Sequence, residues 1–286
     1  MQKKKYLQNL IQLNFAVLII STSGTLGRYI ELPVPLIILL RALIGGFFLY
    51  IFCKWKKMSF KIKEKDRMTV FLSGVLMGVH WITYFIALKL SSVAIGMLSV
   101  FTYPIITTFL EPLMLKSKFK KSNLLLGLMV LVGIYFLAPE FSLENDQFKA
   151  IGFGVFSALC YSIRNIYMKS KSKEYEGSIL MVYKLIIVSV LLSPVFFLYN
   201  MIGLESSLPA VLILALLTTA TGHTLFIYSF RNFNISTASI ISGVQPVYGI
   251  VFGMIVLGEY PAMTTIFGGL LILGTVLIES IRNFRE

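Results

Sequence analysis

The sequence predicts an all-α polytopic membrane protein with ten transmembrane helices, arranged as two inverted five-helix repeats. Three observations favour this fold class. Hydrophobic residues make up 57% of the 286 residues and charged residues only 14%, whereas an average soluble domain has about 25% charged residues. The mean hydropathy is +0.82. The apolar residues also gather into runs of about 20 residues, the length that a helix needs to cross about 30 Å of hydrocarbon.

Ten such runs follow one another along the chain, with short polar links between them. They cover roughly residues 8–28, 34–53, 68–88, 92–115, 123–139, 150–168, 178–200, 208–230, 236–257 and 261–281. The first run follows lysines 3–5 and therefore has the beginning of a signal peptide. Its apolar part continues past the small residues 21–24, and further runs follow, so we expect an uncleaved first helix.

The positive charges predict the orientation of these helices. Most of the 26 Lys and Arg residues fall in alternate links, at residues 3–5, 54–67, 116–121, 169–173, 231 and 282–285. In the intervening links, which would lie on the opposite side of the membrane, the positive residues are only Arg28, Lys89 and Lys149. Because cytoplasmic links carry an excess of Lys and Arg, we expect both termini in the cytoplasm. The net charge of +13 then reflects topology and contact with anionic lipid, and it does not indicate nucleic-acid binding.

The two halves of the chain, residues 1–140 and 149–286, show a weak internal similarity. When the halves are superimposed in sequence, Pro104 falls on Pro246 and Tyr103 falls on Gln245. Each half contains an odd number of spans, so the second half enters the membrane in the opposite sense. This is the inverted repeat of secondary carriers, whose substrate path lies between the halves near the midplane.

These features together resemble the drug/metabolite transporter superfamily, in its EamA-like branch, over essentially the whole chain. The residues that carry the resemblance are Arg41, Tyr103-Pro104, Pro246 and Gly258-Glu259. The group His80-Trp81, Tyr84 and Tyr103-Pro104 is similar to that of the aromatic amino-acid exporters in this branch. The chain departs from the family pattern at Ser117, where the first half often carries its own glutamate.

The resemblance implies a secondary transporter in a bacterial cytoplasmic (inner) membrane, working by alternating access. Its first candidate substrate is an amino acid or a related amphiphilic solute, and export is the favoured direction. A proton-coupled importer of an amine or other metabolite stays open as an alternative. From other classes, a lipid-modifying membrane enzyme or a channel receives little support, because the sequence has no large loop and no repeated pore ring.

Polar and aromatic residues within the apolar runs are the candidate substrate-binding groups, since polar groups in spans usually face a pathway. They are His80, Trp81, Tyr84, Tyr103, Tyr161, Tyr183, His223, Gln245 and Tyr248. His80 and His223 are the only histidines of the chain, and both lie near the middle of a run. The alternative for each histidine is a purely structural role, in which the imidazole forms a hydrogen bond with a neighbouring carbonyl.

The ionisable residues within or beside the runs are the candidate gating or coupling groups, namely Arg41, Glu111, Arg164 and Lys184. For Arg41 and Lys184 the alternative is a side chain that reaches the nearer membrane interface. For Glu111 the alternative is an ion pair with Lys116 or Lys118, and the functional interpretation is a proton site.

The remaining patterns predict no chemistry. The sequence contains no GxxxxGK[ST], HExxH or GxSxG motif, and Cys53 and Cys160 have no metal-ligand spacing with the histidines. We therefore expect no enzyme activity, no cofactor and no metal. The expected partners are a small-molecule substrate, the lipid bilayer and, as a candidate coupling ion, protons; no nucleic acid is expected, and the choice between monomer and homodimer stays open.

Overall fold

The chain folds into a bundle of helices in the computed structural model, which describes residues 2–116, 122–137, 142–229 and 242–285. No strand occurs within these ranges. The helices of the first half are α1 (Gln2–Tyr29), α2 (Val34–Trp55), α3 (Glu64–Leu90), α4 (Val93–Val100), α5 (Tyr103–Leu115) and α6 (Ser122–Leu137). Those of the second half are α7 (Asp146–Glu174), α8 (Gly177–Leu192), α9 (Val195–Leu198), α10 (Leu204–Ile213), η1 (Leu214–His223), α11 (Thr224–Ser229), α13 (Gln245–Leu257) and α14 (Met263–Arg285).

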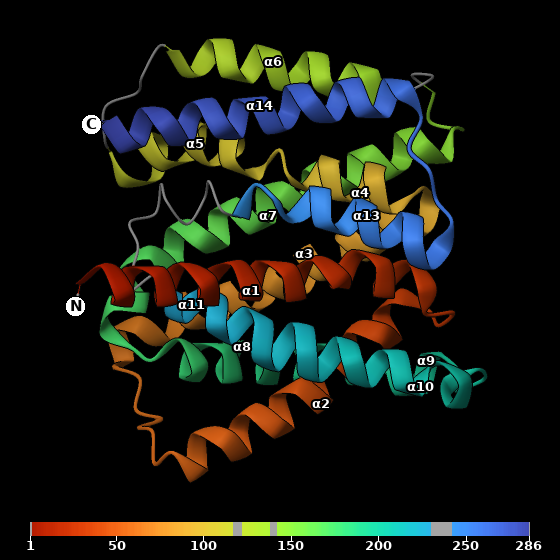
Figure 1. The fold of residues 1–286 in the computed structure, drawn as a ribbon. Coiled ribbons are helices and arrows are strands. Elements are labelled where there is room, and N and C mark those ends of the chain that lie inside the picture. Colours follow the sequence, from red (N-terminus) through yellow and green to blue (C-terminus); the bar gives the residue numbers. More distant parts are fainter. Residues whose placement is uncertain (1, 117–121, 138–141, 230–241, 286) are drawn as a thin grey trace.

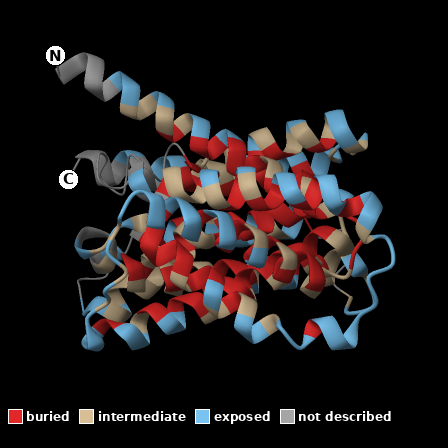
Figure 2. Ribbon diagram, turned by 90° about the horizontal axis from the view of Figure 1, so that it is seen from below, coloured by how far each residue is buried: buried red, intermediate tan, exposed pale blue. Residues whose placement is uncertain are grey.

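Helix α1 begins and helix α14 ends at the same end of the bundle, which we call the termini end (Figure 1). The opposite end is called the far end. Figure 2 shows that buried residues occupy the middle of the bundle and exposed residues its outer faces. Among the described residues, six helical segments are long and apolar enough to cross a membrane, and three further apolar helices are shorter. The chain is thus an integral, multi-pass membrane protein by length and composition of its helices.

Three of the expected continuous helices are interrupted. The run 92–115 breaks after Val100, and α5 begins afresh with Pro104 in its first turn. A proline is tolerated there because the first backbone N–H groups of a helix have no partner within it. The run 178–200 breaks at Pro194, and the run 208–230 changes into the π-helix η1. In the run 236–257, α13 begins only at Gln245, and residues 236–241 lie outside the described part.

The bundle consists of a central group of helices and an outer pair. Helix α3 packs along α7, α2 along α8, and α1 along α13 and η1, while α4 lies between α7 and α13. Helices α6 and α14 pair on one side of this group (Figure 1). Glycines permit their close approach, since a Cβ added at Gly268 would lie 2.6 Å from the Gly133 carbonyl oxygen. These glycines therefore serve a contact within the chain.

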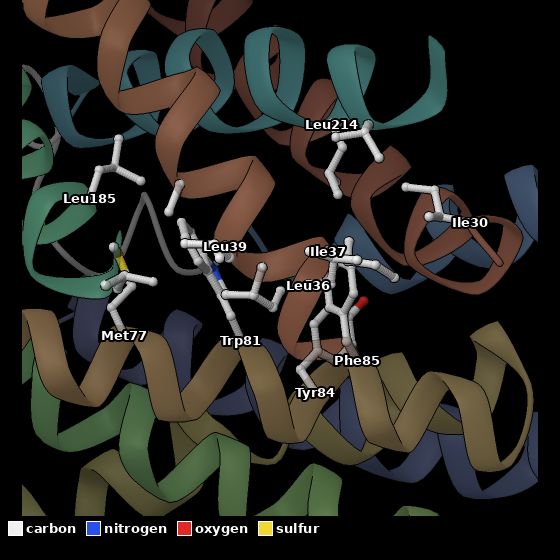
Figure 3. Close-up of a cluster of buried hydrophobic side chains, with 14 of the residues drawn as sticks. Ile30, Leu36, Ile37, Leu39, Met77, Trp81, Tyr84, Phe85, Leu185 and Leu214 are labelled. Carbon is white, nitrogen blue, oxygen red and sulfur yellow. The ribbon is translucent and has the colours of Figure 1, made fainter. Parts of the chain in front are cut away.

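The largest buried cluster joins α2, α3, α8 and η1 (Figure 3). Its side chains include Leu36, Leu39, Met77, Trp81, Phe85, Leu185 and Leu214. Lipid is as apolar as these side chains, so close packing and dispersion contribute more to this cluster than exclusion of water does. The cluster holds α2 and α3 in a fixed relation, and both helices carry candidate functional residues.

A polar network joins α3 and α7 at the termini end, beyond the apolar runs. Asp66 is buried and accepts hydrogen bonds from Lys171 Nζ (2.6 Å) and the Tyr175 hydroxyl (2.5 Å). Lys63 Nζ donates to Glu174 over 3.0 Å. The hydrogen bond to Asp66 raises the pKa of Tyr175, and the hydrogen bond and charge of Lys63 lower the pKa of Glu174. Opposite charges thus hold these two helix ends together.

Candidate functional site

A central cavity of about 50 Å³ lies among α1, α2, α3, α4, α5, α7, η1 and α13. Its lining includes, from the expected binding and gating residues, Arg41, His80, Trp81, Tyr84, Tyr103, Tyr161, His223 and Gln245. These side chains come from both halves of the chain and meet only in the fold. Their role in binding a solute stays a prediction.

Two of the expected binding residues lie elsewhere. The Tyr183 hydroxyl donates to the Phe60 carbonyl (2.6 Å), so this side chain ties α8 to the segment before α3. Tyr248, like Leu10 and Leu225, packs against a buried cluster formed by α1 residues and Phe226 of α11. Neither residue lines the cavity, and α8, which we expected to contribute to it, supplies no lining residue.

The cavity sits where two interrupted helices begin. Tyr103 is the first residue of α5 and Gln245 the first residue of α13, and each is followed by a proline. Discontinuous helices near the midplane are typical of carriers, because helix ends present partial charges and free backbone groups to a bound solute. The sequence pairing of Tyr103-Pro104 with Gln245-Pro246 therefore corresponds to two similar structural features.

His80 is held against α7 by its hydrogen bonds with Ser157. The Ser157 hydroxyl donates to the His80 carbonyl (2.8 Å), and His80 Nδ1 lies 2.7 Å from Ser157 Oγ and 3.2 Å from the Ser157 carbonyl. Because the hydroxyl proton is used, we assign Nδ1 as the donor and Nε2 as an acceptor. The ring also stacks on Tyr84 and contacts Tyr161. His80 is thus both satisfied by its neighbours and part of the lining.

Arg41 is the charged residue of the lining and is only 1% exposed. Its Nε donates to Thr219 Oγ1 over 2.5 Å. Longer contacts of 3.4–3.5 Å reach Ser23, Thr218 and His223. Its guanidinium carbon lies 4.0 Å from the centre of the Trp81 ring. Arg41 therefore does not reach a membrane interface, and its contacts connect α1, α2, α3 and η1.

The π-helix η1 places polar groups around Arg41. Thr218 and Thr219 both donate their hydroxyl protons to the Leu214 carbonyl, at 2.5 Å and 3.0 Å. Their oxygen lone pairs then face the guanidinium as acceptors. His223 Nε2 is also an acceptor towards Arg41, since a guanidinium can only donate. A π-turn at this position agrees with the frequent occurrence of such turns at functional sites.

Two further cations are buried beside the cavity without lining it. Arg164 is 8% exposed, stacks on Tyr161 at 4.2 Å and donates to Asn165 Oδ1. Lys184 is 4% exposed and lies in α8. The interface-reaching alternative is wrong for Lys184 as for Arg41, because both are enclosed by neighbouring helices. A gating or coupling role for these residues stays a prediction.

Glu111 lies at the termini end, 33% exposed, in an ion pair with Lys169 of α7. The expected partners were Lys116 and Lys118. Lys116 instead ends α5 in the left-handed conformation (φ 52°) and has no ion pair with Glu111, while Lys118 lies outside the described residues. Glu111 thus pairs with a lysine at the termini end, but with one from another helix. A proton-coupling role stays untested.

Several lining residues and one polar cluster could not be predicted from the sequence. Ile20, Ser23, Met97, Val100 and Phe101 complete the cavity, but their types are ordinary for a membrane helix and gave no signal. At the far end, Arg28 Nε lies 3.0 Å from Glu259 Oε1. Glu259 Oε2 accepts from the Val93 backbone N–H at the start of α4 (2.8 Å).

This far-end cluster also contains Lys89, whose Nζ donates to the carbonyls of Arg28 (3.0 Å) and Ile30 (2.5 Å). The cluster joins the ends of α1, α3, α4 and α13, so it links the two halves of the chain. In the sequence, Arg28 and Lys89 indicate only the orientation of the helices. The pair Gly258-Glu259 was the signal that marked this place. In the described part of the chain, no three His, Cys, Asp or Glu side chains lie together in a way that could hold a metal ion.

A bundle of apolar helices that encloses a polar, aromatic cavity between two halves is the architecture of a membrane transporter. The chain belongs to the EamA-like transporter family, which it matches over residues 10–138 and again over 148–280. It is 28% identical over 196 residues to a protein of Archaeoglobus fulgidus described as an uncharacterized transporter, covering 68% of this chain and 70% of that protein. A solved crystal structure is similar with a TM-score of 0.68 at 16% identity, covering 97% of this chain and 98% of that one, which supports the fold alone.

Proposed function

We propose that this chain is a secondary transporter that moves a small organic metabolite through the central cavity by alternating access. The observation that carries the proposal is the cavity itself, where polar and aromatic side chains of both halves meet at two interrupted helices. The first candidate substrate is an amino acid or a related amphiphilic solute, and export is the favoured direction. Neither the family nor the relative is described as an enzyme.

The packing of the helices supports two inverted five-helix halves, residues 1–140 and 149–286. If α1 corresponds to α7 and α3 to η1, the contact of α1 with η1 corresponds to that of α7 with α3. Likewise, α1 with α13 corresponds to α7 with α4. The pairs α2–α8, α4–α13 and α6–α14 are then each formed by equivalent helices. A two-fold axis in the membrane plane would produce this set of contacts.

The proposal includes ten spans in a bacterial cytoplasmic membrane with both termini inside, and the helix arrangement and the positive charges support the number of spans and their orientation. The termini end carries the lysine-rich links and would face the cytoplasm. The far end, closed by Arg28, Lys89 and Glu259, would face outward.

The size of the cavity indicates that binding requires an opening motion. Small-molecule sites usually enclose about 300–1,000 Å³, and the cavity measures about 50 Å³. Helices that are already broken at residues 101–102 and before Gln245 offer places where such a motion can occur. A relative movement of the halves would then expose the cavity first to one side and then to the other.

A counterflow assay on purified protein in liposomes tests the function. Liposomes are loaded with an unlabelled candidate, and entry of the same labelled compound from outside is followed for amino acids, amines and nucleotide sugars. We expect transient accumulation of one class above that of protein-free liposomes. Lack of counterflow with every class would contradict a transport function for this cavity. Uptake of the compound class that shows counterflow is then measured with and without a pH gradient across the liposome membrane. This comparison distinguishes a facilitator from a proton-coupled importer.

A further inference from the structure

The cavity has an uncompensated positive charge. Among the lining residues that the structure describes, Arg41 is the charged one, and none carries a carboxylate. Within the described part of the chain, Arg41 forms no ion pair, and its hydrogen-bonding partners are hydroxyl groups and one imidazole. A buried ion without an opposite charge is costly in a helix bundle. An anion bound in the cavity would remove this cost.

The geometry around Arg41 leaves donors for such an anion. A guanidinium has five N–H donors. Only Nε has a short hydrogen bond, to Thr219, and the three contacts of the terminal nitrogens are 3.4–3.5 Å long. The flat face of the guanidinium rests on Trp81. The edge that carries the terminal nitrogens is therefore the part suited to a planar carboxylate, which accepts two parallel hydrogen bonds.

The surroundings favour an anion over a cation. Arg164 and Lys184 are also buried, and neither has an ion pair in the described residues. The described lining otherwise supplies aromatic rings, hydroxyls, imidazoles and the Gln245 amide. An ammonium group would find no negative partner there, whereas an aromatic or apolar body would pack against Tyr103 and Tyr161.

We infer that the cavity binds organic monocarboxylates, with the carboxylate on Arg41 and an aromatic or apolar body along the tyrosines, and that an ammonium group is not required. This inference rests on the proposed transport function and specifies its substrate class. We expect an aryl or 2-oxo acid to bind more tightly than the zwitterionic amino acid with the same skeleton. Both the acid and the amino acid should bind more tightly than the corresponding amine.

Three compounds that share a phenylethyl unit test the inference on the wild-type protein. They are 3-phenylpropanoate (carboxylate only), phenylalanine (both groups) and 2-phenylethylamine (ammonium only). Binding to purified protein is measured by calorimetry, and movement by counterflow in liposomes. We expect 3-phenylpropanoate to bind at least as tightly as phenylalanine. The amine should bind about tenfold or more weakly, the factor expected when a charge-assisted hydrogen bond is lost.

Variants at Arg41 locate the carboxylate. R41Q should remove the difference between carboxylate and amine, and R41K should keep part of it, because an ammonium keeps the charge but not the planar fork. R67Q is the matched control, since Arg67 is a surface residue, 67% exposed, beside Glu64. If R41Q does not fold, the comparison of the three compounds on the wild-type protein still tests the inference. The dependence of uptake on a membrane potential provides a second test. A membrane potential should drive uptake of 3-phenylpropanoate and leave that of phenylalanine unchanged.

Two results would overturn the inference. One is binding of the amine that equals or exceeds that of 3-phenylpropanoate, and the other is an R41Q variant that folds and keeps the wild-type preference. Either result leaves the transport function intact if counterflow of any compound class is seen. Absence of counterflow for all classes would instead contradict the proposed function.

Discussion

Tyr103 shows how a single side chain in the cavity can be tested separately from its packing. Its ring contacts Tyr161 at 4.6 Å and Phe101 at 5.5 Å, both edge to face. Y103F keeps these ring contacts and removes only the hydroxyl. We expect a severalfold loss of counterflow with little change in melting temperature, because a polar group of the cavity contributes to solute binding more than to packing.

The matched control for Y103F is Y199F, because Tyr199 follows α9 at the far end, outside the cavity. It should transport like the wild type. Equal counterflow of Y103F and the wild type would show that the Tyr103 hydroxyl does not contact the solute.

Glu111 illustrates the limit of sequence reasoning about partners. The nearby Lys116 and Lys118 were the obvious candidates, since they follow in the same segment. The pair with Lys169 arises because α5 packs along α7, a relation between residues far apart in the chain. Arg41 shows the same limit, since its position could be predicted but its partners in α1 and η1 could not.

The placement of Glu111 predicts the behaviour of E111Q. A partly exposed ion pair contributes about 0–1 kcal/mol to stability, and Glu111 is 33% exposed. E111Q should therefore keep counterflow and the wild-type response of uptake to a pH gradient. The measurement is uptake into liposomes with and without an imposed gradient. Loss of gradient-driven accumulation with intact counterflow would instead make Glu111 the coupling site.

At the scale of helices, hydropathy located the elements but not their interruptions. Run length depends on local composition, so α2 and α3 lie close to the expected ranges. The break after Val100 is followed by Pro104 in the first turn of α5, and the π-helix η1 brings Thr218 and Thr219 into contact with Arg41. A proline inside an apolar run was the usable signal for the first, and no local signal existed for the second.

The contact between α6 and α14 predicts different effects for two glycines of α14. A Cβ at Gly268 would meet the Gly133 backbone at 2.6 Å, whereas a Cβ at Gly274 would meet nothing within 4 Å. G268A should lose about 1–3 kcal/mol of stability through overpacking. G274A should be neutral or gain up to about 1 kcal/mol, because Ala is the better helix former. Thermal unfolding in detergent compares them, and equal melting temperatures would contradict this close packing.

The ion pair between Lys63 and Glu174 predicts a pH-dependent contribution to the joint of α3 and α7. The pKa of the Glu174 carboxyl lies below its ordinary value of 4.5, chiefly because of the hydrogen bond and the charge of Lys63. The charge of Lys171 lowers this pKa further, and the charge of Asp66 opposes the shift. A carboxyl group whose pKa is lowered by folding stabilises the fold at pH values above its unfolded-state pKa. This stabilisation is lost as the pH falls through the folded-state pKa. E174Q should therefore melt slightly below the wild type at pH 7, and the difference should shrink as the pH falls below 4.5 and vanish below the folded-state pKa.

The control for E174Q is E144Q, because the Glu144 carboxylate has no ion pair in the described residues. It should melt like the wild type at every pH. A difference between E174Q and the wild type that persists unchanged below pH 4.5 would contradict the ion-pair origin of the effect.

At the scale of the whole molecule, the sequence predicted an all-helical membrane protein and most of the cavity lining. The lining could be foreseen because polar and aromatic residues are rare in apolar runs and seldom face lipid. Tyr183 and Tyr248 did not fit this rule, because the Tyr183 hydroxyl bonds to a backbone carbonyl and Tyr248 packs against a buried apolar cluster of α1 and α11. The far-end cluster was missed because its residues also serve as ordinary loop charges.

Chemical labelling of a single cysteine in the cavity tests alternating access most directly. Val100 lines the cavity and is 7% exposed. V100C is made in a protein whose buried Cys53 and Cys160 are replaced by Ala. A membrane-impermeant maleimide is then applied to each face of oriented vesicles. We predict labelling from both faces, with a transported solute slowing both reactions, because one site opens alternately to either side. Labelling from only one face, or from neither, would contradict the account.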